Sequence, residues 1–131
     1  MNYYLLDTNI WIALAKKDLS VISRLKNRKP GQILSCAIVR AELLFGARKS
    51  QQVERNLMGF QNMLQPFVSL PFDDQCAEYY GIVRATLERA GTPIGGNDLL
   101  VASIALAHDC TLVTRNNSKF ARVAGLRLEV W

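Results

Sequence analysis

The strongest constraint in this sequence is an aspartate that directly follows a short apolar run. Residues 3–6 are tyrosine and leucine, Asp7 comes next, and Thr8 and Asn9 precede another apolar stretch. A short run that is apolar on both faces is typical of a buried strand in a parallel sheet. A carboxylate at the end of such a strand loses hydration, so a cation, a proton or several hydrogen-bond donors must meet Asp7.

Strands and helices alternate along the rest of the chain. Apolar runs predict further strands at residues 33–34, 67–70, 111–114 and 126–130, with a polar connection at 115–120. Amphipathic patterns predict helices at about residues 10–15, 19–25, 36–49, 51–64, 74–90 and 97–106. This alternation favours an α/β sandwich with a mainly parallel sheet. With 131 residues, of which 50% are hydrophobic, the chain fits a single domain, residues 1–131.

Several polar residues stand where the predicted helices begin or end. Ser35 is placed to cap the helix that starts near residue 36, and Asn97 is placed to cap the helix that follows it. Asp73 or Asp74 would cap the long helix before residue 90, and Gly91 would close that helix in a left-handed conformation.

The charge of the chain suggests a class of partner. The formal net charge is +5, and the segment 16–29 contains six cations against one anion, Asp18. Nucleic acid is a natural partner of such a segment. A solvated helix face on a moderately basic protein explains the same pattern, and charge alone leaves both explanations open.

The cysteine and histidine content argues against a zinc site. Cys36, Cys76 and Cys110 are far apart in the sequence and have apolar or small neighbours, so we expect reduced core thiols in a reducing compartment. The only histidine, His108, stands alone near the end of an apolar helical run, which favours a structural role. No apolar run is long enough to cross a membrane, and we expect a cytoplasmic protein.

Three acidic residues are expected at one rim of the sheet. In a doubly wound parallel sheet, ligands collect beyond the carboxyl ends of the strands. Asp7 ends a strand at that rim, and Asp98 starts the helix that leads back to the strand at 111–114. Glu42 lies in an apolar stretch of the second crossover helix, where a charge needs a charged neighbour.

Converging carboxylates repel one another unless a hard divalent cation lies between them. Mg²⁺ or Mn²⁺ with oxygen ligands and retained waters meets this demand. Such a cluster is typical of phosphodiester cleavage, because the ion polarises the phosphoryl group and activates a bound water.

Each of these acids also has a structural explanation. Asp7 could be a turn residue, Glu42 half of an intrahelical ion pair, and Asp98 a helix N-terminal anion. Their joint placement, rather than any single residue, favours the metal site. The remaining acids outside the caps are expected to be surface charges: Asp18, Glu54, Glu78, Glu88, Asp109 and Glu129.

Four segments resemble the PIN-domain ribonucleases in their order and spacing. These are residues 6–9 (LDTN), 41–46 (AELLFG), 93–102 (PIGGNDLLVA) and 112–116 (LVTRN). More narrowly, the chain resembles the VapC-type toxins of bacterial toxin-antitoxin modules, and the similarity continues to residues 125–131. Each motif is weak alone, whereas the four together are specific.

The resemblance implies a three-layer sandwich in which helices cover both faces of a five-stranded parallel sheet. It implies a Mg²⁺- or Mn²⁺-dependent endoribonuclease that forms a homodimer and is neutralised by a cognate VapB-type antitoxin. Asp7, Glu42 and Asp98 would be the catalytic, metal-binding acids. Thr8 would orient Asp7 or a metal-bound water, and Thr114 would help to position the loop after its strand.

One position departs from the family pattern. Many members carry a fourth acid after the strand at 111–114, where this chain has Asn116 and, further on, Lys119. An asparagine offers a neutral oxygen to a metal, so we expect one well-occupied ion and a second, more weakly held ion that RNA phosphates would recruit. Asn116 is equally compatible with a turn.

The substrate and the class of activity are less constrained by sequence. Members of this kind often act on transfer RNA, which we take as the expected substrate. Arg84 and Arg115 are candidate phosphate contacts, although surface arginines need no ligand. A PIN-fold RNA- or partner-binding domain that has lost activity remains the alternative. A phosphatase that forms an aspartyl-phosphate at Asp7 is disfavoured, because its neighbours are Thr8 and Asn9.

Overall fold

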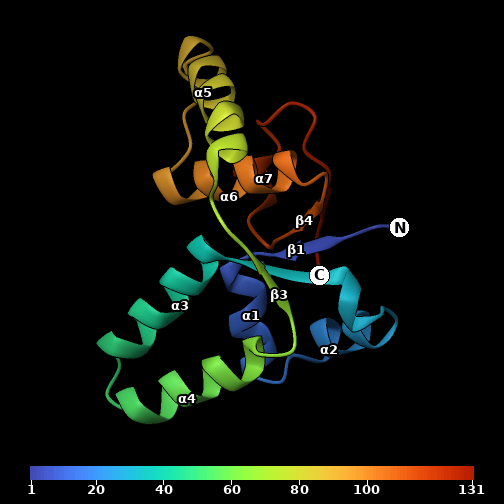
Figure 1. Ribbon diagram of the computed structural model, residues 1–131, viewed down its shortest axis with the longest axis vertical. Helices are drawn as coiled ribbons and strands as arrows, with labels where there is room; N and C mark the ends of the chain where they lie inside the picture. Colours follow the sequence, from blue (N-terminus) through green and yellow to red (C-terminus); the bar gives the residue numbers. More distant parts are fainter.

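Five short strands form one parallel sheet in the computed structural model, which describes residues 1–131 (Figure 1). The strands lie in the order β3-β2-β1-β4-β5, and all four pairings are parallel. Leu5 at the centre of the sheet is paired with Leu34 on one side and Leu112 on the other. The strand bounds are β1 Tyr4–Leu6, β2 Ile33–Cys36, β3 Val68–Leu70, β4 Thr111–Val113 and β5 Leu128–Glu129.

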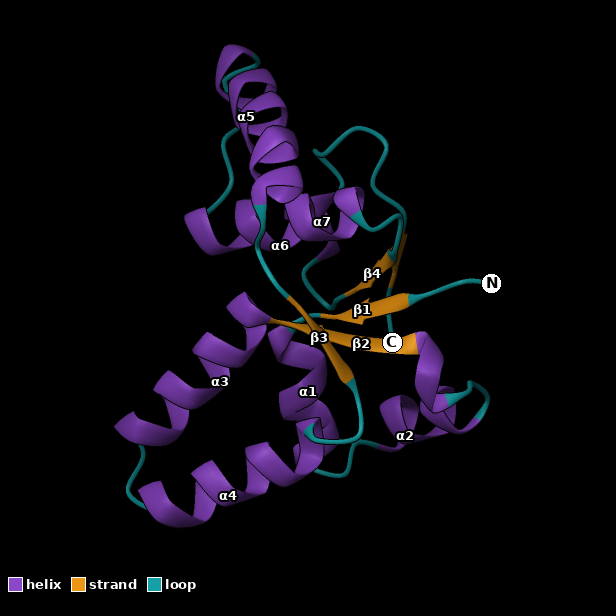
Figure 2. Ribbon diagram, in the orientation of Figure 1, coloured by secondary structure: helices purple, strands orange, loops and turns teal.

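Helices cover both faces of this sheet (Figure 2). The helices α1 to α4 lie on one side of the strands, and α5 to α7 lie on the other. The predicted three-layer α/β sandwich is therefore confirmed. The bounds are α1 Thr8–Ala15, α2 Leu19–Lys26, α3 Ala37–Lys49, α4 Val53–Leu64, α5 Asp74–Arg89, α6 Gly96–Ala107 and α7 Asn117–Phe120, with a 3₁₀ turn at Pro30–Gln32.

The core lies between the sheet and the two helix layers. Leu5, Leu6 and Leu112 are fully buried, as expected for strands with helices on both faces. Trp11 of α1 is fully buried as well, and its indole nitrogen donates to the carbonyl of Leu6 at 3.0 Å. This bond fixes the start of α1 against the end of β1, where the apolar run of the sequence stops.

Two of the predicted helix caps are confirmed. Asp73 accepts a hydrogen bond from the backbone nitrogen of Cys76 at 3.1 Å, which caps α5. Gly91 follows that helix with a φ of +72°, the left-handed conformation that glycine adopts without strain.

Two other predicted caps are wrong. Ser35 lies inside β2, which extends to Cys36 rather than ending at residue 34. Cys36 therefore takes the N-cap position of α3. Asn97 lies inside α6, which begins at Gly96 with Gly95 as its N-cap. Neither of the observed N-caps makes a side-chain hydrogen bond. A prediction that depends on a capping side chain therefore places both helix starts wrongly.

The region after β4 is also more structured than expected. The segment 115–120, predicted as a polar connection, contains the short helix α7. The last strand is shorter than the predicted 126–130 and includes only Leu128 and Glu129. The three cysteines are free and buried, as predicted. None of the helices combines the length and the apolar character that spanning a membrane requires.

Two of the acids predicted to be surface charges, Asp18 and Glu129, are partly exposed and form ion pairs across the fold. Asp18 caps α2 and forms an ion pair with Arg115 at 2.9 Å, and this partner lowers the pKa of the Asp18 carboxyl. Glu129 pairs with Arg28 at 2.9 Å and with Arg24 at 3.7 Å. These partners lie far away in the sequence, which explains why local patterns did not reveal them.

Arg28 and Trp131 join the segment after β5 to the rest of the fold. The guanidinium carbon of Arg28 lies 4.5 Å from the ring centroid of Tyr4 and 4.8 Å from that of Trp131. The indole of Trp131 donates to Glu129 at 2.8 Å, and Trp131 is only 5% exposed. Arg28, one of the six cations of segment 16–29, therefore serves the fold.

Trp131→Ala should lower the free energy of unfolding by about 3–5 kcal/mol, because it removes a buried aromatic ring and the face on which Arg28 lies. The measurement is urea denaturation followed by circular dichroism. Val130→Ala is the matched control, since Val130 is exposed and should change stability by less than about 0.5 kcal/mol. Equal losses for the two variants would contradict the packing role of Trp131.

Candidate active site

The candidate site lies where β1 and β4 end side by side. Within the sheet, β2 and β3 lie on one side of β1, and β4 and β5 lie on the other side of β1. The strand order therefore reverses at β1. Open α/β sheets usually bind ligands beyond the carboxyl ends of the strands at the point of such a reversal. Asp7 directly follows β1, and Thr114 directly follows β4.

Asp7 is buried, and each of its two carboxylate oxygens accepts one hydrogen bond. It is 6% exposed, accepts from the backbone nitrogen of Thr8 at 2.8 Å and accepts from the hydroxyl of Thr114 at 2.9 Å. Burial raises the pKa of the Asp7 carboxyl; the two hydrogen bonds oppose this effect, and the nearby Asp98 adds to it. The protein thus holds a carboxylate in a place that disfavours its charge.

Glu42 comes to this site from α3. Its Oε1 accepts a hydrogen bond from the hydroxyl of Thr8 at 2.9 Å. Partial burial raises the pKa of Glu42, and the carboxylates of Asp7 and Asp98 raise it further, while the Thr8 hydroxyl and the nearby Asn97 side chain lower it. No cation forms an ion pair with Glu42, so the intrahelical ion pair is excluded.

Asp98 reaches the same place from the first turn of α6. Its Oδ2 lies 3.5 Å from the position that a Cβ on Gly95 would occupy, so the carboxylate folds back over the start of the helix. It acts electrostatically on both Asp7 and Glu42. The structure therefore brings together the three acids that were selected from the sequence.

Thr114 links the acids to the loop after β4. Its hydroxyl oxygen accepts from the side-chain nitrogen of Asn9 at 3.3 Å and from the backbone nitrogen of Asn116 at 3.0 Å. Asn9 in turn accepts from the backbone nitrogen of Arg115 at 3.2 Å. Asn9 was not selected from the sequence as a site residue. Its position two residues after Asp7, which follows the end of β1, could have indicated it.

Thr8 and Thr114 contact the acids through different groups. The backbone of Thr8, rather than its hydroxyl, contacts Asp7, while the hydroxyl orients Glu42. Thr114 contacts Asp7 as well as the loop that it was expected to position. Asn116 lies at the N-cap of α7, where its backbone nitrogen donates to Thr114 but its side-chain amide makes no capping hydrogen bond.

The two candidate phosphate contacts have partners within the chain. Arg84 on α5 pairs with Glu88 at 3.1 Å and donates to the hydroxyl of Tyr80 at 2.9 Å. Arg115 pairs with Asp18 and also donates to the carbonyl of Trp131 at 2.8 Å. Their role in RNA binding stays a prediction.

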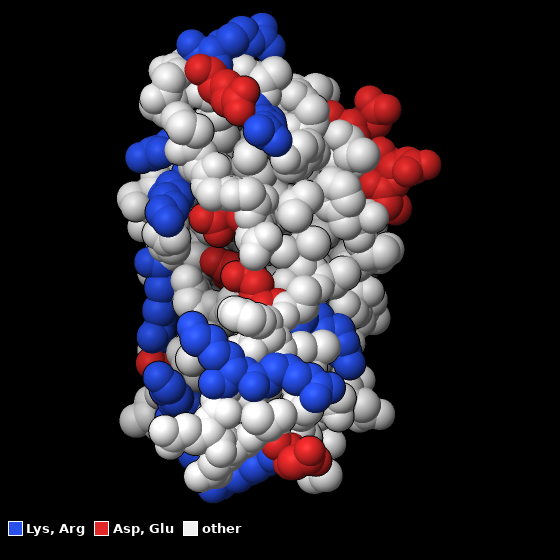
Figure 3. Space-filling model, turned by 90° about the vertical axis from the view of Figure 1, so that its left-hand side faces the viewer, with Lys and Arg blue, Asp and Glu red and all other residues white.

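The chemistry of these side chains suits a hard divalent cation. All of the converging ligands are carboxylate oxygens, and no lysine or arginine pairs with any of the three acids. Figure 3 shows acidic side chains gathered near the middle of the face on the left of Figure 1, with lysine and arginine around them. Burial is the main cause of the raised pKa values of Asp7 and Glu42, and an ion at the acids would offset both this burial and the smaller repulsion between the carboxylates.

Comparison with known proteins agrees with this geometry. The PIN domain family matches residues 4–126. The chain is 41% identical to ribonuclease VapC2 of Rickettsia felis over 98% of this chain and 97% of the relative. It is 35% identical to the tRNA(fMet)-specific endonuclease VapC of Shigella flexneri with the same coverage.

Solved structures are similar as well. The DNA-bound VapBC of Salmonella typhimurium superimposes with a TM-score of 0.93 at 34% identity, covering 100% of this chain and 99% of that one. The VapBC2 of Rickettsia felis bound to a promoter DNA fragment gives 0.90 at 39% identity, covering 98% of both chains. The chain belongs to the PIN-domain family, within the group of VapC ribonucleases.

Proposed function

We propose that this protein is a divalent-metal-dependent endoribonuclease and the toxin of a toxin-antitoxin module. The observation that carries the proposal is the convergence of Asp7, Glu42 and Asp98 without any cationic side chain to neutralise them. The relatives named as ribonucleases support the reaction, and the VapBC structures support the module. Residues 1–131 form the single domain that carries this activity.

The three acids would hold Mg²⁺ or Mn²⁺, with Asn116 placed near a weaker second position. The bound ion supplies Lewis-acid polarisation of the phosphoryl group and a more acidic water. Thr114 holds Asp7 in place, and Thr8 holds Oε1 of Glu42. The other oxygen of Glu42 would be free to accept a proton from the attacking water.

Transfer RNA is the proposed substrate, because one similar relative is named as a tRNA(fMet)-specific endonuclease. A cognate VapB-type antitoxin is the proposed inhibitor, and the active form is a homodimer in the cytoplasm. The alternative is a catalytically weak domain that binds RNA or a partner. Asn116 in place of an acid favours that alternative, so catalysis needs a direct test.

Asp7→Asn and Asp98→Asn should abolish cleavage of transfer RNA in the presence of Mg²⁺ or Mn²⁺, because each removes a charged oxygen ligand. The measurement is sequencing of RNA ends, which should carry 5′-phosphates and 3′-hydroxyls in the wild type. Asp109→Asn is the matched control, since Asp109 is exposed and pairs only with Arg127. Cleavage that continues in excess EDTA would exclude the metal mechanism, and wild-type binding without cleavage would favour the alternative.

Thr114→Val should reduce cleavage by about 10–100-fold, because it removes the hydroxyl that orients Asp7 while keeping the shape of the side chain. Part of the loss should be recovered at higher Mn²⁺ concentration. Thr86→Val is the control, since the hydroxyl of Thr86 bonds only within α5. Unchanged cleavage by Thr114→Val would remove Thr114 from the supporting residues.

A further inference from the structure

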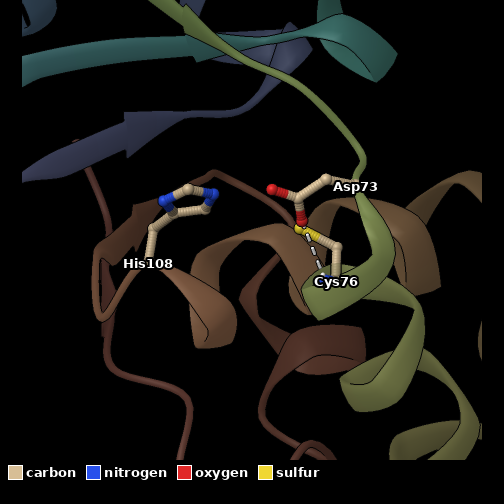
Figure 4. Close-up of side chains that lie close together, drawn as sticks. All are labelled: Asp73, Cys76 and His108. Atoms are coloured by element: carbon tan, nitrogen blue, oxygen red, sulfur yellow. Dashed lines mark hydrogen bonds between the residues drawn. The ribbon is translucent and has the colours of Figure 1, made fainter.

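A second group of metal-ligating side chains lies outside the acidic site. One ligand atom each from Asp73, Cys76 and His108 lies within 4.8 Å of the others. Figure 4 shows the imidazole of His108 turned towards the carboxylate and the thiol. Asp73 and Cys76 lie at the start of α5, while His108 ends α6, so two packed helices contribute to the group.

The nitrogen of His108 is the feature that the fold leaves unexplained. Its Nε2 is buried and has no hydrogen-bond partner. Such an orphaned polar atom costs free energy, and native structures rarely keep one without a ligand or a water. His108 lies near enough to Asp73 to contribute to the lowered pKa of that carboxyl, after the larger effect of the hydrogen bonds from Cys76, yet no hydrogen bond or ion pair joins the side chains of Asp73 and His108.

We propose that Asp73, Cys76 and His108 bind a transition-metal ion of the Zn²⁺ type. An oxygen, a sulfur and an imidazole nitrogen form a donor set that suits Zn²⁺ and does not suit Mg²⁺. Ligand bonds of about 2.0–2.3 Å place neighbouring ligands of a tetrahedral ion about 3–4 Å apart, which the present spacing approaches. A water molecule completes the coordination.

The surroundings allow an ion to enter. Asp73 is exposed, and a surface cavity of ≈ 290 Å³ reaches His108 from the β3 side of the sheet, lined also by Val68 and Leu70. Cys76 is fully buried, and its thiol lies 3.7 Å from the carbonyl of Pro71. The metal binds the thiolate, so the thiol proton leaves to solvent as the sulfur–metal bond forms.

This inference revises the expectation drawn from the lone histidine. The sequence has no histidine pair and no Cys-x-x-Cys motif, which argued against zinc. The fold instead brings an Asp-x-x-Cys pair at a helix start to a histidine that is distant in sequence. The structural role of His108, as the C-cap of α6, is compatible with metal binding by its side chain.

The test is a titration of the full-length, metal-free protein with Co²⁺, followed by absorption spectroscopy. We expect a thiolate-to-cobalt charge-transfer band that saturates at one ion per chain and disappears when Zn²⁺ is added. Asp7, Glu42 and Asp98 contribute only oxygen ligands, so these three acids alone do not produce this band. The readout is independent of RNA cleavage.

Variants assign the band to its ligands. Cys76→Ser and His108→Gln should abolish it, and Asp73→Asn should weaken Co²⁺ binding while asparagine still caps α5. Cys110→Ser is the matched control and should keep the band, because the thiol of Cys110 makes its hydrogen bond to the backbone carbonyl of His108 and is not part of the metal-ligating group. Thermal melts followed by circular dichroism verify that each variant folds.

Several outcomes would overturn the proposal. The absence of a band in the wild type is one, and a band that survives in His108→Gln is another. A band that disappears only in Cys36→Ser would place the cobalt beside the acids, since Cys36 lies near Asp7 and Glu42. If Cys76→Ser does not fold, Asp73→Asn and His108→Gln still decide the question.

Discussion

The burial of Asp7 beside two other carboxylates is the constraint around which this fold is organised. Burial and mutual repulsion both disfavour the charged forms of Asp7 and Glu42. The chain meets this cost with hydroxyl and backbone donors from Thr8 and Thr114 rather than with a cation. No lysine or arginine forms a salt bridge with these carboxylates, so none competes with a metal ion for their oxygens.

The position of the acids could be predicted from the sequence, since strand ends and helix starts fix which rim each acid reaches. The alternation of strands and helices likewise sufficed for the three-layer fold. The links around Thr114 could not be predicted, because they depend on the pairing of β1 with β4 and on the path of the loop that follows. Ser35 and Asn97 were misplaced because the true N-caps, Cys36 and Gly95, lack capping side chains.

Positive charge in this chain has two different uses. Arg28 and Arg115 form ion pairs with Glu129 and Asp18 and also hold Trp131, so both stabilise the segment that follows β4. Counting cations along residues 16–29 therefore overestimated the surface available to a polyanion. The net charge of +5 still favours approach of nucleic acid, because long-range attraction depends on the whole molecule.

Helix α6 is buried through its middle, from Val101 to Ala105, with Asp98 in its first turn and His108 at its end. Because other elements pack closely against α6, the helix has little room to unwind locally when its length changes. Inserting a single residue into α6 would turn one end relative to the other by about 100°. The direction in which Asp98 points is thus set by the length of the helix as much as by the identity of the residue.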